Sequence, residues 1–322
     1  GELAGRVCAA AARTGIALTL LPVFYRHGGF GGATPTHGQR RFVTGVDDYE
    51  AIVASSRRHV SELPHGGVGI APHSLRAASV EDIREILPLA DDGPIHIHVA
   101  EQQREVDECI AETGARPVRY LLAHLDVDAR WCLIHCTHLD VAETEALAST
   151  GGVVGLCPTT EANLGDGVFP AELYLEFAGA FAIGSDSNVR IDLPEEVRLL
   201  EYGQRLSTMR RNVLAESGSS TGQRLFDAAL AGGARALGQR VGRIEVGARA
   251  DFVVLDEHDP LLLGRTGEAR LDTWLFAGDS RQVREVWVGG RRVVAEGRAL
   301  CRDDVEAMYA KAVKELMQEG WS

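Results

Sequence analysis

The sequence predicts an α/β fold: a (β/α)8 TIM-type barrel, of which this chain carries strands three to eight, followed by a small β-sandwich second domain. Two observations support this prediction. Apolar segments alternate with helical segments and end near residues 24, 71, 98, 135, 156 and 185. After residue 242 the pattern changes to short alternating segments separated by glycines, which is typical of antiparallel sheets.

The domain boundaries follow from this change of pattern. The predicted barrel occupies residues 1–240, the C-terminal part of the small β domain residues 241–302, and a terminal helix residues 303–322. The chain begins with Gly1 inside what reads as an Ala-rich helix, and six strands do not complete an eight-stranded barrel. We therefore expect an N-terminal segment that completes the barrel to be missing from this chain.

The individual elements follow from hydrophobic period and turn residues. Ser79 and Asp82, three residues apart, form a capping box that predicts a helix start. The glycine-rich segment 25–38 is interpreted as a substrate-facing loop, because no GKS or GKT follows it. Helices are predicted at 3–14, 47–61, 79–88, 101–113, 117–125, 141–149, 195–216 and 221–237, barrel strands at 16–24, 67–71, 95–98, 131–135, 153–156 and 180–184, a loop at 157–167, and second-domain strands within 242–256 and 283–300, with a hairpin turn at 288–291.

Composition limits the partners that the chain can have. Its formal charge of −13 and its pI near 5.3 argue against nucleic acid or an anionic membrane surface. No apolar stretch is long enough to span a bilayer, and the first residues lack a signal-peptide pattern. The six cysteines show no CxxC spacing, which fits free thiols in a reducing compartment. We expect a cytoplasmic protein that acts on a small molecule.

The segment 95–102, IHIHVAEQ, gives the most specific local signal for chemistry. It predicts a strand that ends in His98, with Glu101 about one turn into the following helix. A neutral imidazole at a strand end can bind Zn²⁺ or Fe²⁺, and a carboxylate facing the same cavity can move a proton from metal-bound water to the leaving group. The alternative is a strand histidine bonded to a carbonyl beside an exposed helix glutamate.

Three further histidines lie near these strand ends. His96 shares a strand face with His98, and we interpret it as a lower-layer barrel histidine rather than a ligand. His135 ends the next strand and is the better functional candidate in its segment. Neighbouring Cys136 and His138 lack the second close pair of a closed zinc site, so His138 is interpreted as a supporting residue.

Asp186 follows the last barrel strand, where a carboxylate can hold a metal and bond the attacking water. A capping aspartate is the alternative for this residue alone. Together, the His-x-x-Glu pair, His135 and Asp186 at successive strand ends predict a mononuclear metal hydrolase. On the same rim, His73 and Arg76 are suited to holding a substrate carboxylate, although a solvated surface arginine is equally consistent with the sequence.

The segments PHSLRA, HIHVAEQ, HCTHLD and GSDSNVRIDLPEEVRLLEYGQR resemble the amidohydrolase superfamily, in its mononuclear-metal deaminase branch, and most of all the formimidoylglutamate deiminases of histidine degradation. The resemblance covers essentially the whole chain. It implies one divalent metal ion, zinc with iron as the alternative, and a homodimer by analogy.

On matching positions the resemblance implies that His98 and Asp186 bind the metal. Glu101 would be the proton shuttle, and His135 would polarise the substrate or hold the attacking water. His73 and Arg76 would hold a carboxylate of the glutamate moiety. The implied reaction is attack of metal hydroxide on N-formimidoyl-L-glutamate, which yields N-formyl-L-glutamate and ammonia.

The chain departs from the family pattern at its N-terminal side, since it lacks the His-x-His pair of the first barrel strand and the two metal ligands that this pair supplies. Two alternative functions remain open. One is a deaminase of a nucleobase or nucleoside ring, for which the aromatic candidates are Phe24, Tyr25 and Phe30. The other is a metal-free barrel that serves as a binding subunit.

Overall fold

The structure, a computed structural model, describes residues 1–318. Its parallel strands are β1 (Leu18–Leu20), β2 (Val23–Phe24), β3 (Gly66–Val68), β4 (Ala71–Pro72), β5 (Ile95–Val99), β6 (Trp131–His135), β7 (Val153–Leu156) and β8 (Ala180–Ile183). β1 pairs with β3 and β2 with β4, so β1 and β2 form two halves of one longer strand that runs parallel to a second one formed by β3 and β4. Isolated bridges from Ile70 to Ile95 and from Ser74 to His98 connect them to β5.

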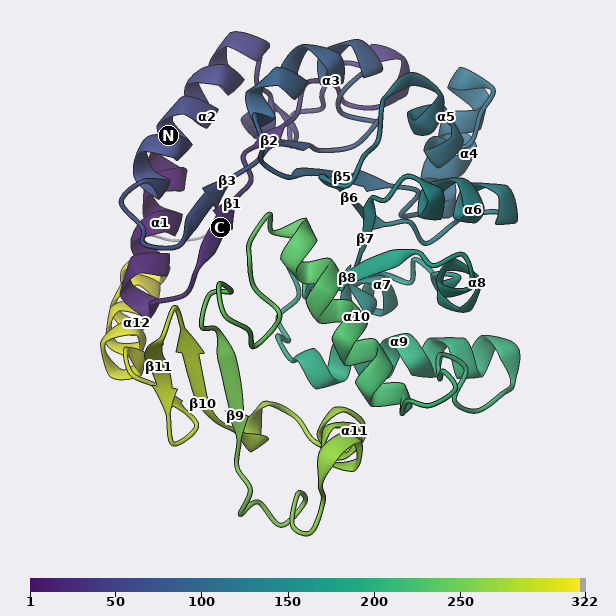
Figure 1. The fold of residues 1–322 in the computed structure, drawn as a ribbon. Coiled ribbons are helices and arrows are strands. Elements are labelled where there is room, and N and C mark those ends of the chain that lie inside the picture. The colour runs from purple at the N-terminus through teal and green to yellow at the C-terminus, as the bar shows by residue number, and fades with distance from the viewer. Residues whose placement is uncertain (319–322) are drawn as a thin grey trace.

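Strands β5 to β8 then pair in sequence order, each parallel to the next. The predicted α/β fold with parallel strands is therefore confirmed, and Figure 1 shows how the strands and their helices curve around the molecule. The helices are α1 (Glu2–Thr14), α2 (Val46–Val60), α3 (Val80–Ile86), α4 (Gln103–Thr113), α5 (Pro117–His124), α6 (Val141–Ser149), α7 (Pro158–Leu164), α8 (Ala171–Glu176), α9 (Leu193–Thr208), α10 (Thr221–Ala236), α11 (Gly267–Ala277) and α12 (Arg302–Gln318).

Alternation along β5 divides its side chains between two faces. Ile95, Ile97 and Val99 are fully buried in the main hydrophobic core, whereas His96 and His98 face the other way and are only partly buried. Burying three such aliphatic side chains contributes roughly 1.5–3 kcal/mol each. The apolar face thus fixes the register that presents His98 at the carboxyl end of the strand.

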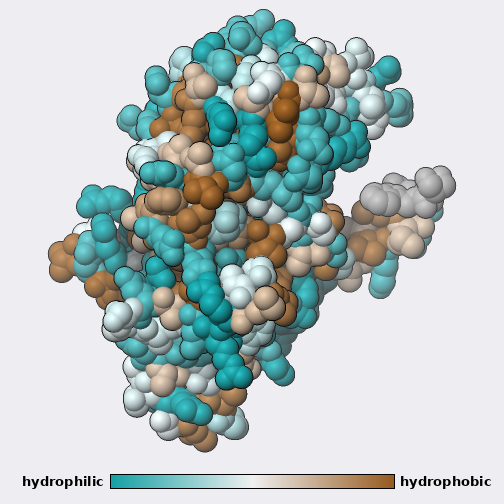
Figure 2. Space-filling view, turned by 90° about the vertical axis from the view of Figure 1, so that its right-hand side faces the viewer, coloured by the Kyte–Doolittle hydropathy of each residue, from teal (hydrophilic) through white to brown (hydrophobic). Residues whose placement is uncertain are grey.

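Helix α10 packs along β8, as Figure 1 shows at the centre of the molecule. The contact is close because Gly232 lies against the chain at Phe181, where a Cβ atom would collide with the carbonyl oxygen. On the face in Figure 2, hydrophobic residues are interspersed with polar ones. No helix within residues 1–318 is long and apolar enough to cross a membrane.

The second sheet is antiparallel and separate from the first, as predicted. Its strands are β9 (Phe252–Leu255), β10 (Val283–Val288), β11 (Arg291–Ala295) and β12 (Arg298–Ala299), in the order β12-β11-β10-β9. Gly289 and Gly290 both have positive φ, 56° and 77°, between β10 and β11. A two-residue hairpin turn with two left-handed residues favours glycine at both positions, which explains the Gly-Gly pair.

Several predicted elements differ from those observed. The predicted loop 157–167 contains helix α7, because Pro158 suits the first helical position and the Glu161 carboxylate accepts the Cys157 N–H. The helix predicted at 195–216 ends at Thr208, where Met209 turns left-handed with φ 58°. Only β9 forms within 242–256, and the helices α8 and α11 were not predicted. The predicted terminal helix is α12, and residues 319–322 lie outside the described residues.

Candidate active site

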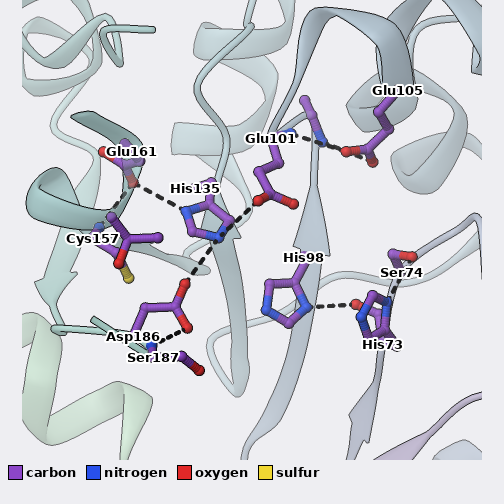
Figure 3. A network of polar contacts seen from close by, with 12 residues as sticks. His73, Ser74, His98, Glu101, Glu105, His135, Cys157, Glu161, Asp186 and Ser187 are labelled. Carbon is purple, nitrogen blue, oxygen red and sulfur yellow. Dashed lines mark hydrogen bonds and ion pairs between the residues drawn. The ribbon is translucent and has the colours of Figure 1, made fainter. Parts of the chain in front are cut away.

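The carboxyl ends of three strands bring the predicted metal-binding and catalytic residues close together. His98 is on β5, His135 ends β6, and Asp186 follows β8. The imidazole rings of His98 and His135 stack with centroids 5.6 Å apart. His135 Nε2 lies 3.8 Å from Asp186 Oδ2 and 3.9 Å from Glu101 Oε1. These four side chains surround a common space, as Figure 3 shows.

Glu101 reaches this space from a turn and not from a helix, so its predicted placement in α4 was wrong. Helix α4 begins at Gln103, and Ala100 has a left-handed backbone with φ 51°. The buried carboxylate of Glu105 accepts the N–H groups of Ala100 and Glu101 at 3.1 and 3.0 Å. This pair of bonds holds the turn after β5 and sets where Glu101 points.

The surroundings of His98 keep its imidazole neutral and leave one ring nitrogen free to bind a metal ion. Its Nδ1 lies 2.8 Å from the carbonyl oxygen of His73, so Nδ1 carries the proton and Nε2 is free to accept. Burial lowers the pKa of His98, and the hydrogen bond to His73 only partly offsets this effect. A neutral imidazole with a free Nε2 is the form that binds a metal ion.

His135 is surrounded by acids. Its Nδ1 lies 3.2 Å from Glu161 Oε1, while its Nε2 faces Glu101 and Asp186. Burial lowers the pKa of His135, but the hydrogen bond to Glu161 and the neighbouring negative charges outweigh burial, so the pKa is raised. The backbone at His135 is left-handed, with φ 70°, which is uncommon for a residue with a side chain.

The donor chemistry fits a divalent metal ion held by His98 and Asp186. The imidazole of His98 is neutral, and Asp186 presents a carboxylate whose side chain is 28% exposed. A second trio, His135, Cys157 and Glu161, places one donor atom each within 4.8 Å of one another. All three residues of that trio are buried, and burial raises the pKa of the Cys157 thiol.

The predicted carboxylate-binding pair lies beside these residues. The His73 ring packs against that of His98, with centroids 5.0 Å apart, and against Tyr25 at 4.9 Å. Burial, His98 and Arg76 lower the pKa of His73 to about 4, so it is neutral. Arg76 Nη2 lies 3.3 Å from Glu101 Oε2, and Arg76 Nε is buried without a hydrogen-bond partner within the described residues.

Both residues line a cavity of about 270 Å³ that also includes Tyr25, Gln39 and Gln102. Arg76 additionally contacts Glu105 Oε2 at 3.8 Å. Arg76 is thus not a solvated surface residue but pairs with Glu101 and Glu105 at the wall of the cavity, which Arg104 and Glu108 also line. Its guanidinium is the cation beside Glu101 that can attract an anionic group.

The two other histidines discussed from the sequence, His96 and His138, bond backbone carbonyls. His96 Nε2 bonds the carbonyl of Ala236 at 2.7 Å, and His138 Nε2 bonds the carbonyl of Asp166 at 2.8 Å. These contacts agree with the structural roles that we predicted for both. Sequence reasoning missed Glu105 and Glu161, although a glutamate in the first turn of a helix that follows a strand is a readable signal.

Residues 15–293 match the model of the amidohydrolase family, so the chain belongs to this family. Among its relatives, it is 48% identical over 318 residues to the formimidoylglutamate deiminase of Pseudomonas aeruginosa, which covers 98% of this chain and 70% of that protein. It is 33% identical over 251 residues to the 5-methylthioadenosine/S-adenosylhomocysteine deaminase of Natronomonas pharaonis, covering 76% of this chain and 55% of that protein.

Solved structures show the same similarity. A Brucella melitensis amidohydrolase matches with a TM-score of 0.93 and 47% identity, covering 98% of this chain and 70% of that one. A Xanthomonas campestris adenosine deaminase with bound zinc matches with a TM-score of 0.81 and 25% identity, over 98% of this chain and 70% of that one. The predicted resemblance and the predicted class, a hydrolase of C–N bonds, are confirmed, and the family supports a bound metal ion.

Proposed function

We propose that this chain carries out the hydrolytic deimination of N-formimidoyl-L-glutamate to N-formyl-L-glutamate and ammonia, a step of histidine degradation. The observation that carries the proposal is Arg76, a guanidinium beside Glu101 in a polar cavity that also contains His73. The 48% identity to a formimidoylglutamate deiminase supports the same substrate. The proposal includes closure of the barrel by two further strands from outside this chain.

The metal in this proposal is zinc, with iron as the alternative, because histidine and carboxylate ligands suit both. His98 and Asp186 would hold it, together with two ligands from outside this chain. When bound, such an ion lowers the pKa of water and so makes a nucleophile available at neutral pH.

Four residues of this chain would then have separate roles in the reaction. Glu101 accepts the proton of the attacking water and delivers it to the departing nitrogen, so that water and the C=NH group become C=O and ammonia. His135 Nε2 faces the same space and stabilises the charge that develops on the substrate. His73 and Arg76 hold a carboxylate and orient the formimidoyl carbon.

A second candidate is a deaminase of a nucleoside ring, which the 33% identity to a nucleoside deaminase favours. A ring would be expected to stack on an aromatic wall. Phe24 is fully buried, and the Tyr25 ring already meets the His73 ring edge-on, with an interplanar angle of 70°. Arg76 in the cavity therefore favours an anionic substrate, and Phe24 is not available for stacking.

The test is a product assay on the full-length gene product with N-formimidoyl-L-glutamate, in which ammonia and N-formylglutamate are followed together. Arg76→Ala is expected to raise KM roughly ten- to a hundredfold, because a charge-assisted contact contributes about 1.5–3 kcal/mol. Arg119→Ala, at a more exposed arginine on α5, is the control and should leave KM unchanged. Ammonia from a methylthioadenosine-type substrate alone would instead support the second candidate.

A further inference from the structure

Glu161 is a buried acid with no part in the proton transfer described above. It lies in the first turn of α7, with 5% of its surface exposed. We propose that Glu161 is the positioning residue of His135, and that it fixes which ring nitrogen faces the reacting atoms. The proposal deepens the proposed function and rests on it for the role of His135.

One carboxylate oxygen makes both contacts that matter. Glu161 Oε1 accepts the backbone N–H of Cys157 at 2.8 Å and lies 3.2 Å from His135 Nδ1 (Figure 3). Cys157 directly follows β7, the neighbour of the strand that His135 ends. The carboxylate that accepts from Nδ1 is therefore also bonded to the backbone at the end of β7, which restricts its movement.

A histidine ring can flip by 180° about its Cβ–Cγ bond, which exchanges the positions of its nitrogen and carbon atoms. With a fixed acceptor at Nδ1, the proton on that nitrogen is retained and the ring keeps one orientation. The consequence is visible on the other side, where Nε2 lies 3.9 Å from Glu101 and 3.8 Å from Asp186. Without Glu161, Nε2 would no longer be directed to these two groups in every molecule.

The helix that carries Glu161 is itself fixed on two sides. The buried carboxylate of Glu196 on α9 accepts the N–H of Thr159 at 2.9 Å. The hydroxyl of Thr160 donates to the carbonyl of Ser185 at 3.1 Å, the residue before Asp186. The first turn of α7 thus contacts both His135 and the loop of Asp186, as a positioning element should.

The experiment compares Glu161→Gln and Glu161→Ala in the metal-loaded full-length protein, with Glu143→Gln as the matched control. Glu143 is a similarly buried acid in the first turn of the preceding helix, α6, where it bonds Arg116 and not His135. We expect Glu161→Ala to lower kcat roughly ten- to a hundredfold with KM within about twofold, since small misplacements of reacting groups cost this much. Glu161→Gln should retain more activity, because its amide oxygen can still accept from Nδ1.

The second readout is nitrogen NMR of histidine-labelled protein, with the His135 signals assigned by their absence in His135→Asn. Nδ1 of His135 should be protonated and hydrogen-bonded in the wild type and in Glu161→Gln, and should lose this signature in Glu161→Ala. If Glu161→Ala does not fold, Glu161→Leu takes its place, because leucine fills a similar volume and cannot accept a hydrogen bond. An unchanged Nδ1 signal in the variant without an acceptor, or a loss of kcat in it no larger than that of Glu143→Gln, would overturn the proposal.

The two proposals fail separately. If the wild type releases no ammonia from N-formimidoyl-L-glutamate, the substrate assignment is wrong. The Nδ1 signal requires no substrate, so it still shows whether Glu161 fixes the ring of His135.

Discussion

The carboxyl ends of β5 and β6 differ sharply from the loop that follows β8, although both contribute to one site. At β5 and β6, the His98 ring bonds the carbonyl of His73, the His135 ring bonds Glu161, and Glu105 accepts the backbone N–H of Glu101. After β8, Asp186 Oδ1 accepts, among residues 1–318, only the N–H of the next residue, Ser187, at 2.6 Å. The site therefore has a supported side and an accessible side.

Exposure follows the same division. Glu105 and Glu161 are almost completely buried, at 1% and 5%. Val189 and Ile191, in the loop after Asp186, are 98% and 79% exposed. Buried acids that satisfy backbone N–H groups at a strand end are costly to replace, whereas exposed loop residues are not. The comparison predicts that substitutions on the supported side change chemistry and stability together.

The largest effect should come from Glu101→Gln, which keeps the size of the side chain but removes its capacity to take a proton. We expect kcat to fall by about 10²- to 10⁴-fold in the product assay. Metal content, measured by elemental analysis, should stay the same, because the proposed ligands His98 and Asp186 are untouched. Gln103→Ala, at an exposed residue at the start of α4, serves as the control. A Glu101→Gln protein with more than a tenth of wild-type kcat would remove Glu101 from the mechanism.

A direct test of the two sides pairs Glu105→Gln with Asn188→Ala. Glu105→Gln weakens the acceptor for the N–H groups of Ala100 and Glu101, so the free energy of unfolding should fall by about 1–3 kcal/mol. In the loop after β8, the Asn188 side chain accepts the N–H of Arg190. Asn188→Ala should therefore change the free energy of unfolding by less than about 0.5 kcal/mol. Urea unfolding of both variants gives the comparison, and equal losses would show that the two sides are held alike.

The supported side was also the easier one to predict in outline. Strands β6 and β7 were predicted to the residue, because their apolar side chains are continuous and their neighbours are clear turn residues. The position of His135 follows directly from that pattern. A sequence pattern of this kind reports which residues are buried, and burial determines where a strand ends.

The contacts that hold Glu101 and His135 in place could not be predicted in the same way. Helix α7 has only seven residues between Pro158 and Gly165, so its proline and glycine read as loop signals, and Glu161 was placed in a loop. Glu101 was placed in a helix because nothing in the sequence reveals the left-handed backbone of Ala100. Both errors concern backbone turns that are held by tertiary hydrogen bonds, which local propensity does not contain.

The smallest expected effect tests whether the support extends to the glycine-rich loop. Asp82 completes the capping box of α3 with Ser79 and also binds Arg26 and His27 from that loop. Burial raises the pKa of Asp82, but the hydrogen bonds from Ser79, His27 and Arg26 outweigh it, and the net pKa is lowered. A carboxyl whose pKa is lower in the folded state contributes stability above its unfolded value of about 3.9, and this contribution disappears as the pH falls through the folded value.

Asp82→Asn should therefore lower the free energy of unfolding by about 1 kcal/mol near pH 6, and the difference from wild type should shrink toward pH 3. Glu81→Gln, at an adjacent residue with a side chain 79% exposed, should show no such dependence. Urea unfolding at a series of pH values measures both. A difference between Asp82→Asn and wild type that stays constant down to pH 3 would mean that Asp82 does not hold the loop by its charge, and the supported side would then end at α3.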